Sequence, residues 1–132
     1  MIKGLFPMCA DILHTGHILA IAEAKEHCDY LIVALNTHPD GKSPVQSVFE
    51  RFAQLSALGC VDKVIPYQGR KDMELIASVL PYQIRFLGED YMGKDWDGKE
   101  QERERGIEWY FISRKHGLSS TELKQRIKRS MK

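Results

Sequence analysis

The chain has 132 residues, 43% of them hydrophobic and 28% charged, and these values are typical of a folded globular protein and exclude extensive disorder. Its 19 basic and 18 acidic residues leave a net charge of +1, which provides no general field to attract a nucleic acid. No segment approaches the length of a membrane span or has the apolar run of a signal peptide, and the three cysteines form no CxxC pair. We therefore expect a single-domain, reduced, cytoplasmic protein with no membrane or nucleic-acid partner.

Short apolar runs alternate with helical patterns along the chain. The run at residues 29–35 is almost continuously apolar, as in a central parallel strand that is buried on both faces. Ser47 and Glu50 have the spacing of a capping box and predict a helix start, whereas Pro7 predicts the end of the first strand. In chain order we predict strand 2–6, helix 15–28, strand 29–35, helix 47–58, strand 62–67, helix 72–80, strand 82–87, polar loop 89–98, strand 106–113 and helix 121–130.

This alternation defines the fold class. Repeated strand–helix–strand units with right-handed crossovers predict an α/β fold, a doubly wound parallel sheet of five strands. Such a sheet binds its ligand beyond the carboxyl ends of the strands, where the strand order reverses. The loop after the first strand, residues 7–14, is therefore the first place to look for chemistry.

A histidine motif occupies that place. His14 and His17 are three residues apart at a predicted helix start, so their rings project from one face of the first turn. The free amides of the turn favour an anion, and Gly16 leaves room for a phosphate to approach closely. Two imidazole donors there suit phosphate charge that grows during phosphoryl or nucleotidyl transfer. The alternatives are a metal-binding pair, for which the sequence nominates no third ligand, or two histidines without a special role.

A second motif leads into the last helix. Arg114 precedes a segment with three hydroxyls, Ser119, Ser120 and Thr121, at another helix N-terminus. These groups are suited to phosphate oxygens, although the spacing of Ser119 and Glu122 also predicts a plain helix cap. The basic residues of this helix are expected to form a solvated face that complements its negative end: Lys124, Arg126, Lys128, Arg129 and Lys132.

The two motifs carry a family resemblance. Residues 11–17 follow the pattern D-x-x-H-x-G-H, residues 88–91 read Gly-Glu-Asp-Tyr, and residues 114–121 resemble R-x-x-G-I-S-T-T. The chain thus resembles the cytidylyltransferase-like nucleotidyltransferase superfamily over nearly its whole length, and most closely the glycerol-3-phosphate cytidylyltransferase type. The resemblance implies catalytic roles for His14, His17 and Arg114, no metal held by the protein, and Mg²⁺ that arrives bound to the nucleoside triphosphate.

The resemblance also assigns the remaining site residues. Lys42 would lie on a loop that closes over the substrates, Arg51 near the acceptor phosphate, and Asp11 where it orients the histidine segment or a magnesium-bound nucleotide. The nucleotide-binding residues would be Cys9, Asp11, Gly16, Gly88, Asp90, Gly117, Ser119, Ser120 and Thr121.

The implied reaction is transfer of CMP from CTP to a small phosphorylated alcohol such as glycerol 3-phosphate, with release of pyrophosphate, in a homodimer. Two alternatives stay open. One is an adenylyltransferase of the ADP-heptose-synthase or FAD-synthetase type, which shares both motifs. The other is a catalytically weakened nucleotide-binding module, because Met8, Cys9 and Ala10 replace the family's G-T-F and Gly59 replaces an arginine.

Overall fold

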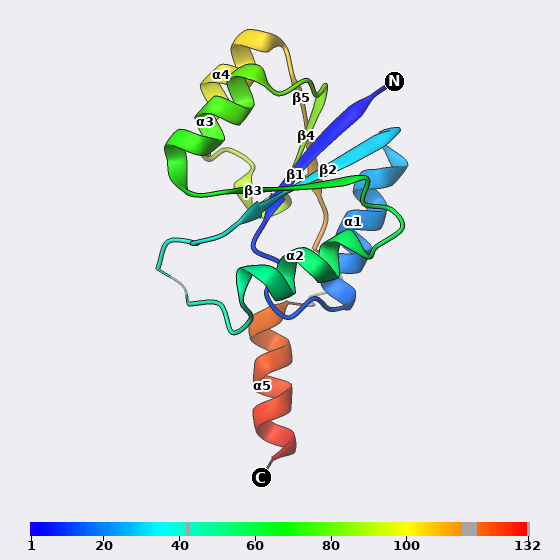
Figure 1. Ribbon diagram of the computed structural model, residues 1–132, viewed down its shortest axis with the longest axis vertical. Coiled ribbons are helices and arrows are strands. Elements are labelled where there is room, and N and C mark those ends of the chain that lie inside the picture. The colour runs from blue at the N-terminus through cyan, green and yellow to red at the C-terminus, as the bar shows by residue number, and fades with distance from the viewer. Residues whose placement is uncertain (42, 115–118, 132) are drawn as a thin grey trace.

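The computed structural model describes residues 1–41, 43–114 and 119–131, along which strands alternate with helices (Figure 1). The strands are β1 (Lys3–Met8), β2 (Tyr30–Asn36), β3 (Lys63–Tyr67), β4 (Ile84–Gly88) and β5 (Glu108–Ile112). The helices are α1 (Thr15–Glu26), α2 (Val48–Ser56), α3 (Gly69–Val79), α4 (Lys99–Arg105) and α5 (Ser120–Ser130), with a short 3-10 turn, η1 (Glu89–Tyr91), after β4.

The strands of the described residues form one parallel sheet in the order β3-β2-β1-β4-β5. Successive strands run outward from β1 to β3 on one side, and the chain then returns to place β4 on the other side of β1. The strand order therefore reverses between β1 and β4. This confirms the predicted five-stranded, doubly wound α/β sheet, and it puts the ligand-binding edge where β1 leads into α1.

Helices cover both faces of the sheet because neighbouring strand residues point to opposite sides. On one face, Phe6 packs in a core with Ile21 of α1 and Leu55 of α2. On the other face, Leu5 packs in a second core with Met73 of α3. Helix α4 lies beside α3. The central strands are apolar on both faces for this reason, as the run at residues 29–35 predicts.

Helix α4 is not predicted from hydrophobic periodicity, because its seven residues are all charged or polar. It is held by a carboxylate instead. Glu102 is completely buried and accepts hydrogen bonds from the Tyr82 hydroxyl (2.6 Å), the Arg85 guanidinium (2.9 Å) and the Trp96 indole N–H (2.9 Å). Burial of a charge is tolerated when it is paired and hydrogen-bonded in this way.

Two of the element boundaries that differ from the prediction have a clear physical reason. Strand β1 continues through Pro7, which aligns with Ala34 of β2 in a part of β1 that lies beyond its pairing with β4. A missing amide donor is tolerated where ladder bonds form on one side only. Helix α3 begins at Gly69 rather than Asp72, whose carboxylate accepts a hydrogen bond from the Gln68 amide at the helix start.

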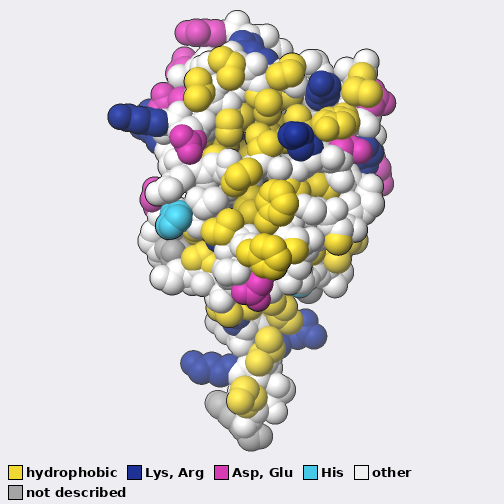
Figure 2. Space-filling model, in the orientation of Figure 1, with side chains coloured by type: hydrophobic (Ala, Val, Ile, Leu, Met, Phe, Trp, Pro, Cys, Tyr) yellow, Lys and Arg dark blue, Asp and Glu magenta, His cyan; other side chains and the backbone are white. Residues whose placement is uncertain are grey.

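Two surface features stand out. Helix α5 projects away from the sheet, and its residues after Leu123 are exposed (Figure 1). Hydrophobic side chains gather over α2 and β3 in the space-filling view (Figure 2), where Phe49 is 79% exposed and Val48 and Phe52 are also exposed. Within the described ranges, no helix combines the length and the apolar character needed to cross a bilayer.

Candidate active site

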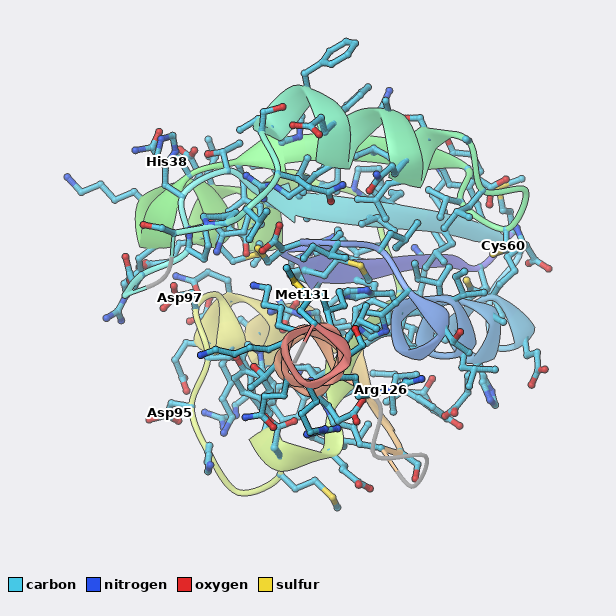
Figure 3. The ribbon with its side chains drawn as sticks, turned by 90° about the horizontal axis from the view of Figure 1, so that it is seen from below. His38, Cys60, Asp95, Asp97, Arg126 and Met131 are labelled. Carbon is cyan, nitrogen blue, oxygen red and sulfur yellow. The ribbon has the colours of Figure 1, made fainter. Side chains whose placement is uncertain are left out.

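The loop between β1 and α1 lies at the carboxyl edge of the sheet, beside the point where the strand order reverses. Seen from below, α5 is viewed end-on, between α1 and the segment that carries Asp95 and Asp97 (Figure 3). Three segments that are far apart in the sequence thus meet near one edge: the start of α1, the residues after β4 and the start of α5.

His14 and His17 are held by reciprocal hydrogen bonds at the start of α1. The Nδ1 atom of His14 accepts from the Gly16 amide at 2.9 Å, and the Nδ1 atom of His17 accepts from the His14 amide at 3.3 Å. This is a capping box built from imidazoles, with ring centroids 4.2 Å apart. Since Nδ1 of each ring is an acceptor, the neutral ring carries its proton on Nε2. The pair therefore offers two Nε2–H donors beside a helix N-terminus.

The charge state of His17 follows from its surroundings. The pKa of His17 is lowered to about 4, chiefly by burial and also by the positive charges of His14 and Arg114, against a smaller opposing effect of Asp11. The ring is therefore neutral at pH 7. The neutral ring carries one N–H, on Nε2, that can donate to an anion, and a bound anion would favour the protonated form of the ring.

Asp11 orients the loop that carries the histidines. Its carboxylate accepts hydrogen bonds from the amides of Val45 and Gln46, each at 3.0 Å, and from the Lys124 ammonium at 3.2 Å. Burial of Asp11 opposes ionisation, but these donors outweigh it and the pKa of the carboxyl is lowered. The Gln46 side chain in turn accepts from the Ile12 amide at 2.7 Å. The β1–α1 loop is thus fastened to the segment that precedes α2.

The backbone of this loop is strained on both sides of Asp11. Ala10 and Ile12 have φ angles of 56° and 51°, in the left-handed region. That conformation costs a residue with a side chain about 1–2 kcal/mol. Such strain persists only where the surrounding contacts hold it, and it is typical of functional loops.

Arg51 makes many of the contacts that hold the strained β1–α1 loop in place. The residue is 1% exposed, and its guanidinium donates to the carbonyl oxygens of Cys9 (3.1 Å), Asn36 (2.7 Å), Thr37 (3.1 Å) and Gln46 (3.3 Å). The geometry does not support the expected contact with an acceptor phosphate, because the guanidinium is buried and engaged by backbone carbonyls. Arg51 instead joins the loop after β1, the end of β2 and the start of α2.

Gly88 and Asp90 lie against Arg114. The Arg114 guanidinium pairs with the Asp90 carboxylate at 3.3 Å, and the Arg114 amide donates to Glu89 Oε1 at 3.0 Å. A Cβ atom at Gly88 would lie 2.5 Å from the Asp90 carboxylate and 2.6 Å from the Arg114 guanidinium, so a larger residue there would make this pair of side chains shift. The residues after β4 therefore position Arg114 near His17.

The start of α5 forms the third part of the site. Ser119 is the N-cap, and its hydroxyl accepts from the Glu122 amide at 3.1 Å, so the predicted cap is confirmed. Thr121 is exposed in the first turn. Helix α5 begins at Ser120, but the Ser120 side chain lies outside the described part of the chain, as do Lys42 and Gly117.

Sequence reasoning missed two partners in this site. Glu89 receives the Arg114 amide, and Lys124, expected on a solvated face, pairs with Asp11. Neither pair is visible in the sequence, because each joins residues that only the fold brings together. Among the described residues, no group of three or more His, Cys, Asp or Glu side chains has the arrangement of a metal site.

Known proteins share both the sequence pattern and the fold. The model of the cytidylyltransferase-like family matches residues 5–126. The bifunctional protein HldE of Vibrio cholerae (serotype O1, strain M66-2) is 38% identical over 126 residues, which are 91% of this chain and 26% of the relative. HldE of Proteus mirabilis (strain HI4320) is 36% identical over 127 residues, which are 92% of this chain and 27% of the relative. The chain spans about a quarter of the length of these relatives.

Two solved structures extend the comparison. The lipopolysaccharide core biosynthesis protein from Thermoplasma volcanium GSS1 has a TM-score of 0.67 at 29% identity, covering 86% of this chain and 95% of that protein. Pantothenate synthetase from Thermus thermophilus has a TM-score of 0.52 at 17% identity, covering 86% of this chain and 55% of that protein, and shows a shared fold alone.

The doubly wound sheet, with paired histidines at the start of the first helix and Arg114 near them, fits the nucleotidyltransferase superfamily. With the family model matched over residues 5–126, the chain belongs to the cytidylyltransferase-like family.

Proposed function

We propose that this chain is an adenylyltransferase that joins the AMP part of ATP to a phosphorylated sugar and releases pyrophosphate. The observation that carries nucleotidyl transfer is the His14–His17 pair in the first turn of α1, with Arg114 near it. ATP is favoured by the relatives, since the HldE proteins and the Thermoplasma volcanium lipopolysaccharide core protein support the ADP-heptose-synthase type over transfer of CMP to glycerol 3-phosphate.

The proposed reaction is a direct displacement. A phosphate oxygen of the acceptor attacks the α-phosphorus of ATP and forms a new P–O bond. The bond from the α-phosphorus to the β-phosphate breaks, and its electron pair leaves with pyrophosphate. Negative charge develops on the transferring phosphoryl group and on the leaving oxygen, and the Nε2–H donors of His14 and His17 stabilise it.

The other residues position the triphosphate. Arg114 makes charge-assisted contacts to the β- and γ-phosphates, together with the amides and hydroxyls at the start of α5. Gly16, which is buried in the first turn of α1, allows the phosphates to approach the backbone. We retain Lys42 as a residue of the closing loop and Gly117 as part of the phosphate segment.

We further propose that Mg²⁺ arrives on the triphosphate as part of the substrate and offsets its charge. The donors at the site are imidazoles, amides and hydroxyls, which suit phosphate oxygens. We also retain the homodimer as a proposal, and the exposed hydrophobic side chains of α2 are compatible with it.

The test is pyrophosphate release with Mg²⁺ and each of ATP, CTP, GTP and UTP, combined with a heptose 1-phosphate or with glycerol 3-phosphate. We expect turnover with ATP and the heptose phosphate. Turnover only with CTP and glycerol 3-phosphate would restore the cytidylyltransferase interpretation. Triphosphate binding without turnover on any acceptor would instead identify a nucleotide-binding module.

A further inference from the structure

Helix α5 is attached to the molecule in a different way from α1. Its residues from Lys124 to Ser130 are exposed, and among its described side chains Glu122 and Leu123 are half-buried. The helix projects from the sheet edge rather than packing along a face (Figure 1). Its start therefore depends on contacts near the first turn to hold it at the site.

One ion pair supplies such a contact. The Lys124 ammonium lies 3.2 Å from the Asp11 carboxylate, whose side chain is 9% exposed. Among the ion pairs of the described residues, those of Arg126 and Arg129 stay within α5, because both go to Glu122. The Lys124–Asp11 pair joins α5 to the histidine loop.

The Asp11 carboxylate is held in place by other hydrogen bonds. The Asp11 carboxylate also accepts the amides of Val45 and Gln46, so it is held in place with or without Lys124. The ordering cost of the ion pair therefore falls mainly on the lysine, which makes a partly buried pair of this kind more favourable than an exposed one.

The pair connects the two ends of the site. Asp11 is three residues before His14, and Lys124 lies just over one turn after the Ser119 cap. We propose that Lys124 is a positioning residue: its bond to Asp11 sets the start of α5 relative to the histidine pair, so that both helix N-termini reach one triphosphate. The proposal rests on the proposed function.

The first test is the affinity for MgATP, measured by calorimetry without acceptor. Lys124→Ala should weaken MgATP binding about three- to tenfold, the range expected for loss of a partly exposed ion pair. Lys124→Arg should restore most of the affinity because it keeps the charge and the reach. The matched control is Lys128→Ala, which removes the same charge from an exposed position one turn further along α5 and should bind like wild type.

A double-mutant cycle separates positioning from direct contact with phosphate. If Lys124 acts through Asp11, Lys124→Ala should add little to the loss already caused by Asp11→Asn. An equal loss in both backgrounds would mean that Lys124 acts on the triphosphate by itself, and the proposal would be overturned.

Hydrogen–deuterium exchange of the protein without nucleotide provides a readout that is independent of the reaction. Lys124→Ala should speed amide exchange at residues 120–125, and Lys128→Ala should not. If the wild-type protein binds no triphosphate, the proposed function is refuted, but the exchange test still shows whether Lys124 positions the start of α5. If amide exchange in Lys124→Ala matches that in Lys128→Ala, the positioning role of Lys124 is overturned, even if MgATP binds.

Discussion

The two helix N-termini at the site differ in how firmly they are held. Helix α1 starts with a reciprocal capping box and buries Ile21 and Ala24 in the core, whereas α5 starts with a single serine cap and is exposed after Leu123. We attribute this difference to the separate roles proposed for the two helix N-termini. In the proposed reaction the histidines meet charge at the reacting phosphorus and need a fixed geometry, whereas the groups at the far end of the triphosphate must also release pyrophosphate.

The largest effect should come from the rigid end. His14→Asn and His17→Gln replace the imidazoles with side chains that keep the cap and the capping box, so α1 should still form. Each should lower kcat by about a hundredfold or more, as expected when a donor to the transition state is removed. Pyrophosphate release at saturating substrate measures the loss.

Alanine at these positions would mix two effects, because loss of the cap alone costs about 0.5–2 kcal/mol of stability. Thermal unfolding of the Asn and Gln variants is the control. Near wild-type turnover in either well-folded variant would remove that histidine from the chemistry.

The second effect concerns Arg51, which supports the β1–α1 loop next to the histidine pair. Arg51→Met leaves partly buried carbonyls of three segments without their donor, and should lower the free energy of unfolding by about 2 kcal/mol. Arg126→Ala, on the exposed part of α5, should change it by about 0.5 kcal/mol or less. Urea unfolding of both variants measures the contrast. Equal losses would contradict the assignment of Arg51 to the support of the β1–α1 loop.

A third effect tests the placement of Arg114 between the two ends. Gly88→Ala should displace the Arg114 guanidinium, because the added Cβ would lie 2.6 Å from it, and the φ of −66° at Gly88 suits alanine without strain. MgATP binding should weaken about tenfold, the equivalent of one charge-assisted hydrogen bond. Gly59→Ala adds a methyl group where no atom lies within 4 Å and should bind like wild type. Unchanged affinity in Gly88→Ala would separate Arg114 from the triphosphate.

The sequence predicts the elements that apolar patterns define, and it predicts where the histidines lie. The run at residues 29–35 forms the interior strand β2, and His14 and His17 lie at the first helix start at the expected sheet edge. Apolar patterns do not predict helix α4, because all of its residues are polar or charged and its buried contact is the carboxylate of Glu102.

Long-range polar pairs are a second limit. The resemblance puts Arg51 near an acceptor phosphate, but the fold brings four carbonyls from three separate segments around it. The pairing of Asp11 with Lys124 joins residues more than a hundred positions apart. Local patterns report periodicity and caps, and they carry no information on which distant groups a buried charge will meet.

The electrostatics of His17 give a pH dependence with a definite sign. Its pKa falls to about 4 in the folded protein, from an ordinary value of 6.5. Between these values the unfolded chain binds more protons, so the contribution of His17 to stability is present above pH 6.5 and is lost as the pH falls toward 4. The acid side of the unfolding profile should therefore flatten in His17→Gln relative to wild type.

The most direct test of a neutral, half-buried donor at the proposed triphosphate site is an NMR titration of the His17 ring with and without MgATP. We predict a pKa near 4 in the free protein, because burial and the neighbouring positive charges disfavour protonation. Addition of MgATP should raise this pKa, since phosphate charge next to the ring favours the protonated form. A pKa near 6.5 that does not move when MgATP binds would contradict the account.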